Sequence, residues 1–366
     1  MSLALLLALQ SQGAASAPPV YQAIAAGSSS TCGLTTDGTV LCWGSNDYGQ
    51  LGGANAPRSA VPVTIASPLR FHQLSAGQVH ACALTEEGQA FCWGDDRGGQ
   101  LAAPSSDRCA HRARCAKRPI AAAGKLRFRQ LAASAFSTCG LAADGLTYCW
   151  GRNQFGQLGD GTTKDRRKPT LVAGAPAFER LIGSAAGVCG VTAEGVTLCW
   201  GYEAAAPVGG QPGYAPTPLS LGANLAGVHP GACGLSSSGV ATCTFMRASS
   251  DFSQGVTSAR VTGPIDRLLA DLATGMGPIF CGLTGDGAAY CWGPRSYEDL
   301  VAGKGFAAVA VSESRRFRTL TLGFEHACGI TPAGAAYCWG SNSEGQLGDG
   351  TDAARADAPV AVVPPN

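Results

Sequence analysis

The chain has 366 residues with a formal net charge of +1, and only 14% of its residues are charged. This balance argues against a broad electrostatic surface for nucleic acid, and no apolar run approaches the roughly 18 residues that span a bilayer. Gly is abundant, at 51 residues, which favours many short strands joined by tight turns over long surface helices.

The N-terminal segment, residues 1–17, has the pattern of a secretory signal peptide. An apolar run from Leu3 to Leu9 is followed by small residues that end in Ala15-Ser16-Ala17. A basic stretch before the apolar run is missing and Pro18 follows the expected cleavage point, so a disordered start remains the alternative. We expect a mature domain at residues 18–366 in a secreted, periplasmic or cell-surface protein.

Seven segments of the chain repeat one pattern without gaps. In each, a second Cys follows the first by ten positions and a Gly follows it by six. Such self-similarity at a fixed spacing is the signature of a repeat architecture. The repeats occupy residues 32–44, 82–94, 139–151, 189–201, 233–245, 281–293 and 328–340.

Each repeat is predicted to be a β-hairpin that is closed by a disulfide. Around Asp37 the facing residues have numbers that add to 74, with a three-residue loop at 36–38 in which Gly38 supplies the left-handed conformation. This register places Cys32 opposite Cys42, close enough to be bridged. The predicted bonds are Cys32–Cys42, Cys82–Cys92, Cys139–Cys149, Cys189–Cys199, Cys233–Cys243, Cys281–Cys291 and Cys328–Cys338.

The remaining two cysteines lie in an insertion at residues 102–124 and are expected to pair as Cys109–Cys115, which makes eight disulfides from 16 cysteines. An even number of cysteines at fixed spacing favours disulfide bonds, and therefore an oxidising compartment. Zinc binding would need a different pattern, since no Cys-x-x-Cys is present and histidines number five. Reduced buried thiols remain an alternative.

The hairpins are expected to be buried on both faces. All six Trp residues occupy the position that follows the second Cys, and we expect the indole to cover the Gly that follows the first Cys. Further strand signals flank the hairpins, for example at Phe71 upstream and Ala60 downstream. The prediction is an all-β, seven-bladed β-propeller with four-stranded antiparallel blades. Whether the ring closes by sharing strands is left open.

The insertion carries six basic side chains around its predicted disulfide. A tethered basic loop is suited to an acidic partner or an anionic polymer, and the alternative is a solvated surface excursion. A weaker basic cluster follows at residues 166–168. The candidate partner-binding residues are Arg108, His111, Arg112, Arg114, Lys117 and Arg118. His80 and His326 are interpreted as structural, bonding to backbone between blades.

The repeat resembles that of the regulator-of-chromosome-condensation family over about residues 20 to 363. The resemblance rests on the Cys-Trp-Gly hairpin end and on the tail N-x-x-G-Q-L-G at residues 46–52, 153–159 and 342–348, which is worn at 96–102 and absent from the next three units. It implies a seven-bladed propeller. It also implies several activities: nucleotide exchange on a small GTPase with chromatin binding, signalling scaffolds, and secreted members such as a bacterial β-lactamase inhibitor.

Fold does not fix function, and a neutral, apparently exported, cysteine-rich chain departs from the nuclear exchange factors of this family. The leading hypothesis is a non-catalytic extracellular binding protein that presents propeller-face loops to a protein or glycan. Alternatives are a structural component of a cell surface or matrix and, less favoured, a nucleotide-exchange protein. We expect a monomer without enzymatic activity, cofactor, metal site or nucleic-acid partner.

Overall fold

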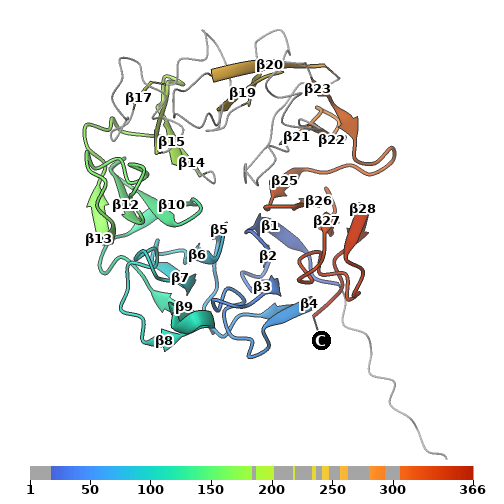
Figure 1. The fold of residues 1–366 in the computed structure, drawn as a ribbon, viewed down its shortest axis with the longest axis horizontal. Helices are drawn as coiled ribbons and strands as arrows, with labels where there is room; N and C mark the ends of the chain where they lie inside the picture. Colours follow the sequence, from blue (N-terminus) through green and yellow to red (C-terminus); the bar gives the residue numbers. More distant parts are fainter. Residues whose placement is uncertain are drawn as a thin grey trace, which may run out of the picture.

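The computed structural model describes residues 18–183, 187–201, 217–218, 233–235, 241–246, 256–262, 280–292 and 306–365. These residues form β-sheets that stand around a central axis, so the molecule is a β-propeller (Figure 1). Among them, no helix has the length and apolar character needed to cross a bilayer.

The sheets are numbered here by the hairpin that each contains, and the strands of the first four follow one another along the chain. Sheet 1 holds β1 (Tyr21–Ala26), β2 (Ser30–Thr35), β3 (Val40–Ser45) and β4 (Arg58–Thr64). Sheet 2 holds β5 (Gln73–Ala76), β6 (His80–Leu84), β7 (Ala90–Asp95), β9 (Arg114–Ala121) and β8 (Asp107–Arg108). Sheet 3 holds β10 (Phe128–Ala133), β11 (Ser137–Ala142), β12 (Thr147–Gly151) and β13 (Arg166–Leu171). Sheet 4 holds β14 (Arg180–Gly183), β15 (Gly187–Val191), β16 (Thr197–Gly201) and β17 (Thr217–Pro218).

The last three sheets contain the shorter strands and the C-terminal one. Sheet 5 holds β18 (Cys233–Leu235), β19 (Ala241–Met246), β20 (Val256–Thr262) and β23 (Phe306–Ala307). Sheet 6 holds β21 (Phe280–Leu283), β22 (Ala289–Trp292) and β24 (Val309–Ala310). Sheet 7 holds β25 (Thr319–Leu322), β26 (His326–Ile330), β27 (Ala336–Ser341) and β28 (Arg355–Ala361).

The expectation of seven complete blades is wrong in its count. Six sheets reach four strands, so the described residues contain six complete blades, and sheet 6 has three strands. In sheet 5 the fourth strand, β23, pairs with β20 in parallel rather than antiparallel fashion. Both exceptions fall in units that lack the Gln-Leu-Gly tail. Residues 263–279, which precede the hairpin of sheet 6 in the chain, lie outside the described residues.

The predicted hairpin register is confirmed. Cys32 faces Cys42 and Gly38 has a φ of +80°. Six hairpin disulfides join Cα atoms 4.0–4.1 Å apart. The loop disulfide Cys109–Cys115 is also formed, with Cα atoms 6.0 Å apart. The backbone of sheet 5 pairs Cys233 with Cys243, but the side chains of that predicted bond lie outside the described residues.

The expected packing of indole on glycine is incomplete, because a second aromatic ring lies closer to the Gly. A Cβ on Gly33 would lie 2.4 Å from Tyr21 and 3.4 Å from Cη2 of Trp43, and one on Gly140 would lie 2.5 Å from Phe128. The N–H edge of the indole faces the neighbouring sheet. Trp43, fully buried, donates its Nε1–H to the carbonyl oxygen of Gln346 at 2.9 Å.

The tail motif is therefore the connector between neighbouring sheets. The indoles of Trp93 and Trp150 likewise donate to the carbonyl oxygens of Gln50 and Gln100 of the preceding sheet, each at 2.9 Å. The Leu of each tail is completely buried. Three tails thus supply the acceptor that the buried indole N–H of the next sheet requires, whereas Nε1 of Trp200, beside the tail of sheet 3, has no hydrogen-bond partner among the described residues.

Two buried histidines reinforce the seams between sheets. His80 Nε2 lies 2.9 Å from Thr138 Oγ1, and that hydroxyl donates to the carbonyl oxygen of Gln100 at 3.0 Å. Because the hydroxyl has one proton to give, the imidazole is the donor at Nε2. His326 makes the same contact with Thr31 at 2.8 Å. The histidines are structural, as expected, but their partner is a threonine hydroxyl and not the backbone.

The ring closes by contact between the first and last sheets, without a shared strand. Figure 1 shows β1–β4 beside β25–β28, and each of these two sheets comes from one continuous segment. Tyr21 and Trp43 pack in one core cluster with Cys328, Ile330 and Leu347. Side-chain packing and hydrogen bonds therefore take the place of strand exchange at the closure.

Candidate interaction surface

The two faces of the propeller differ in their loops. We call the face with the hairpin turns, such as residues 36–38, the hairpin face. The opposite face carries both the turns between first and second strands and the longer loops between third and fourth strands. Backbone hydrogen bonds tie these two kinds of loop together, for example from Ser45 to Ser29 at 2.8 Å and from Asp95 to Val79 at 2.9 Å. We call this second face the loop face.

Charges on the hairpin face are satisfied locally. Hydrogen bonds from the hydroxyls of Thr35 and Thr39 hold the pKa of Asp37 below its ordinary value, with a further contribution from Arg70 of the next sheet. In the same position of sheet 6, Asp286 pairs with Nε of Arg316 at 2.9 Å. In these two turns a carboxylate thus lies near an arginine at the start of the following sheet.

The loop face presents arginines stacked on aromatic rings. Arg97 lies over the ring of Tyr48 and Arg152 over that of Phe136, each with its guanidinium carbon 4.5 Å from the ring centre. The Phe155 side chain is 50% exposed on the same loops. Nε of Arg97 is also fixed by the buried carboxylate of Asp95 at 2.8 Å. Rigid arginine and aromatic side chains are those that dominate binding at protein interfaces.

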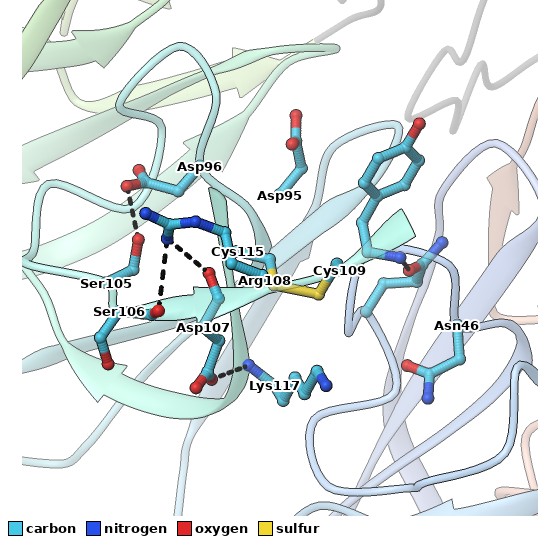
Figure 2. The surroundings of a disulfide bond; sticks show 12 residues. Asn46, Asp95, Asp96, Ser105, Ser106, Asp107, Arg108, Cys109, Cys115 and Lys117 are labelled. Carbon is cyan, nitrogen blue, oxygen red and sulfur yellow. Dashed lines mark hydrogen bonds between the residues drawn. A yellow bond between two sulfur atoms is a disulfide. The ribbon is translucent and has the colours of Figure 1, made fainter. Parts of the chain in front are cut away.

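The insertion adds a structured basic loop to this face. Its disulfide closes residues 109–115, and within that span lies the short 3-10 helix η1 (Ala110–Arg112) (Figure 2). The backbone N–H of Lys117 donates to Asp107 Oδ2 at 2.9 Å, and the N–H of Ala110 donates to the carbonyl oxygen of Asp47 in sheet 1 at 2.9 Å. Only residues 102–113 form an excursion, because the rest of the predicted insertion loop includes the strand β9.

Backbone strain is concentrated at the tip of the basic loop. His111 and Arg112 both have left-handed backbone conformations, with φ values of +55° and +57°. This conformation costs about 1–2 kcal/mol for each non-glycine residue. The disulfide and the contact with sheet 1 hold the tip in this shape, so its basic side chains are presented in a defined position.

The six candidate partner-binding residues do not form one uniform set. Five of them, Arg108, His111, Arg112, Lys117 and Arg118, are exposed. Arg108 folds back to donate to the carbonyl oxygens of Ser106 and Asp107 at 3.3 and 2.9 Å (Figure 2). Arg114 is different, because its Nε lies 3.6 Å from Oδ2 of the buried Asp96. Its first role is thus to compensate a buried charge.

Asp96 is a functional residue of this surface that the sequence reasoning missed. It occupies the place of the tail Asn, and its Oδ1 accepts the N–H of Leu101 as Asn46 accepts that of Leu51. Burial raises the pKa of the carboxyl group, against the opposing effect of a hydrogen bond from Ser105. The sequence signal for this residue was the altered tail at residues 96–102, in which Asp96 replaces the usual Asn. A carboxylate at this buried site needs a cation beside it.

A small cavity of about 140 Å³ lies where the inner strands meet at the axis. Its lining comes from β1, β5, β10, β14 and β25 together with their following turns, and consists of small, aliphatic and amide side chains with one phenylalanine. Gln73 and Gln130 in this wall bond through their amides to the backbone of the next inner strand, at Leu131 and Leu181. The cavity wall is thus engaged in holding neighbouring sheets together.

Sheets tied by internal disulfides, joined through indole and tail contacts and carrying fixed loops on one face, define a β-propeller scaffold. The chain belongs to the family of the regulator of chromosome condensation (RCC1) repeat. Two models of that repeat match residues 21–50, 71–100, 128–157 and 317–346, and residues 37–84, 144–190 and 333–366. The resemblance expected from the tail motif is thereby confirmed.

Solved structures show the same fold at low sequence identity. The Saccharomyces cerevisiae protein Prp20p, described with binding properties to Gsp1p and histones, is 18% identical with a TM-score of 0.71, over 95% of this chain and 87% of that one. Human WBSCR16 is 20% identical with a TM-score of 0.53, over 94% and 81%. The ectodomain of the Physcomitrella patens receptor kinase CR4 is 18% identical with a TM-score of 0.51, over 88% and 74%. A comparison with curated protein sequences gave no significant match.

Proposed function

We propose that this protein is a non-catalytic, monomeric binding scaffold outside the cell, and that its loop face holds a protein or glycan partner. The basic loop is the principal contact in this proposal, through Arg108, His111, Arg112, Lys117 and Arg118, with Arg114 positioned behind them by Asp96. The observation that carries the proposal is that the disulfide-closed basic loop presents exposed basic side chains beside the arginine–aromatic pairs of the loop face.

Rigidity of the loop face supports this role. The first-to-second-strand turns are joined across sheets by backbone hydrogen bonds from Ser28 to Gln78 at 2.8 Å and from Gln78 to Ala135 at 3.1 Å. Loops that are ordered before a partner arrives lose little conformational entropy on binding, and this increases affinity. The same contacts place loops from several sheets on one surface, so that a partner can bridge them.

The cysteine pattern supports an extracellular location. The seven disulfides among the described residues include six inside hairpins, most of whose sulfurs are buried. Disulfides persist in oxidising compartments and are rare in the cytosol of mesophilic cells. Residues 1–17, which lie outside the described residues, are in this proposal the signal peptide that directs export.

The outer strands support the monomeric state. β4, β9, β13 and β28 each carry a proline, at Pro62, Pro119, Pro169 and Pro359. All four strands pair irregularly with the third strand of their sheet over a stretch that includes that proline. Proline and irregular pairing on an edge strand oppose the addition of a strand from another molecule. Edge-to-edge association of propellers is thereby disfavoured.

The proposal is tested by capture from the native extracellular fraction. The intact chain is compared with a variant in which residues 104–113 are replaced by a Gly-Ser linker and Cys115 by Ala. The matched control is Glu87→Gln/Asp144→Asn on the hairpin face. We expect the intact chain and the control to recover the same partner with cross-links to loop-face residues, and the loop variant to recover at least tenfold less. Equal recovery by all three proteins, or recovery of no partner, would contradict the proposal.

A further inference from the structure

The net charge of the whole chain conceals a strong separation of charge. Residues 102–168 contain 13 Lys and Arg against four Asp and Glu, a formal charge of +9. The rest of the chain contains 13 against 21, a formal charge of −8. The positive stretch supplies the basic loop and the outer strands β9 and β13 of two neighbouring sheets. An electrostatic surface is therefore present, although the total charge of +1 does not show it.

A buried carboxylate brings the basic residues of the two sheets together. Arg114 of β9 and Arg167 of β13 both approach Oδ2 of Asp96, each at 3.6 Å. Arg167 is held further by a hydrogen bond of 2.9 Å from its guanidinium to the carbonyl oxygen of Arg97. One acid thus anchors two arginines whose side chains remain 41% and 49% exposed, which leaves an excess of positive charge at the junction.

We define the basic rim as the six exposed cations around this junction. All of them lie on the perimeter of the ring, on the basic loop, at the edge strand β8 or on the outer strands β9 and β13, and these segments contain no Phe, Tyr or Trp. The basic rim consists of Arg108, Arg112, Lys117, Arg118, Arg167 and Lys168. A ligand at such a surface is recognised chiefly by its charge, so the ligand must carry anionic groups along an extended length.

The chemistry of the rim distinguishes among possible polyanions. Single-stranded nucleic acid gains affinity from bases stacked on aromatic rings, which the rim lacks. Duplex DNA is stiff, with a persistence length of about 150 base pairs, so it contacts a convex perimeter over only a short length. An acidic peptide adding as a strand is opposed by Pro119 and Pro169. A flexible polysaccharide follows a convex surface and carries regularly spaced charges.

We propose that the basic rim binds an anionic polysaccharide, whose sulfate or carboxylate groups pair with the arginines and lysines of the two sheets. This inference rests on the exported binding role proposed above and names the chemistry of one partner. Arg114 and Arg167 are positioning residues, because their contact with Asp96 fixes the relative placement of the two basic clusters. Arg112, Lys117, Arg118 and Lys168 are the cations that meet the chain.

The test measures binding of the full-length protein to heparin and to polygalacturonate as a function of salt. The rim variant carries Arg112→Gln, Lys117→Gln, Arg118→Gln and Lys168→Gln. We expect its affinity for the better ligand to fall at least tenfold at low salt. In nucleic-acid complexes each ion pair contributes about 0.7–0.9 to the slope of log affinity against log salt, so the loss of four pairs should reduce the slope by about 3.

The control variant removes the same charge elsewhere, through Arg58→Gln, Arg70→Gln, Arg316→Gln and Arg355→Gln, and we expect it to bind as the unmodified protein does. Equal losses in both variants would overturn the proposal, as would the absence of binding to either polysaccharide. Tighter binding to a 20-base-pair duplex would assign the rim to nucleic acid instead. Retained capture of a partner by the loop face with no polysaccharide binding would refute this inference alone.

Discussion

Two single residues with buried imidazoles, His80 and His326, are expected to make the stability of this propeller sensitive to acid. Burial lowers the pKa of His80 and of His326 from 6.5 to about 4. Each ring donates through Nε2 to a threonine of the neighbouring sheet, and its Nδ1 has no hydrogen-bond partner among the described residues. A second proton on the ring would thus be placed in an apolar site without an acceptor, which explains the direction of the change.

Stability is therefore expected to decrease as the pH falls from 6.5 towards 4. In this range the unfolded chain, with ordinary histidine pKa values near 6.5, binds more protons than the folded protein. From pH 7 to pH 4.5 each histidine should lower the free energy of unfolding by about 2 kcal/mol. Urea unfolding at both pH values measures this loss. His80→Gln should lose about half of the histidine-dependent change, whereas His111→Gln on the exposed loop should retain all of it.

The tail motif is the element that converts separate hairpins into a ring. In sheet 3 its last glycine, Gly159, has a φ of +63°, and a Cβ there would lie 2.9 Å from both Cδ1 of Trp200 and Cγ1 of Val172. Two residues later, Gly161 has a φ of +78° but no atom within 4 Å of a built Cβ. The two positions share a backbone conformation and differ in whether the next sheet lies above them.

Alanine substitutions at Gly159 and Gly161 measure how much the contact between sheets 3 and 4 contributes to the free energy of unfolding. Gly161→Ala should destabilise the protein by about 1–2 kcal/mol, which is the cost of a left-handed conformation in a residue with a Cβ. Gly159→Ala should cost about 1–3 kcal/mol more, because an added methyl group forces the indole and valine of a packed core to move. Chemical denaturation of both variants gives the comparison. Equal effects would mean that the tail does not hold sheet 4 against sheet 3.

Strands whose position is set by nearby residues were predictable from the sequence, and strands whose position depends on another sheet were not. The hairpins follow from the Cys spacing and from Gly38, so their register and the six disulfides within described hairpins were predicted correctly. The fourth strands depend on contacts between sheets, which is why β9 was read as part of a loop and why β23 pairs differently from the expectation. The hydrogen bond of the indole was not predicted for the same reason, since its acceptor lies in the tail of another sheet.

The candidate surface was predictable in composition but not in arrangement. The basic residues of the insertion could be read from the sequence, and five of them are exposed as a binding site requires. The convergence of Arg114 and Arg167 on Asp96 joins residues as far as 71 positions apart in the chain, which no local pattern reports. The overall charge of +1 also pointed away from a charged surface, because it averages over two opposite regions.

For the molecule as a whole, the contact that closes the ring between the first and last sheets uses the same hydrogen bonds as a contact between two interior sheets. Thr31 Oγ1 bonds to His326 at 2.8 Å and donates to the carbonyl oxygen of Gln346 at 3.0 Å, and Thr138 makes the same two contacts between sheets 2 and 3. Thr31→Val and Thr138→Val each remove both hydrogen bonds and leave a buried imidazole N–H without its acceptor. Each should lower the free energy of unfolding by about 1–3 kcal/mol.

Because the contacts match, the two variants should agree within about 0.5 kcal/mol in urea unfolding followed by tryptophan fluorescence, if the first and last sheets are joined as firmly as interior neighbours. A ring whose ends separate readily in solution would behave differently. The Thr31→Val variant would then unfold as the unmodified protein does, since bonds that are already broken contribute nothing, and only Thr138→Val would be destabilised. The size of the difference measures how completely side-chain contacts replace a shared strand.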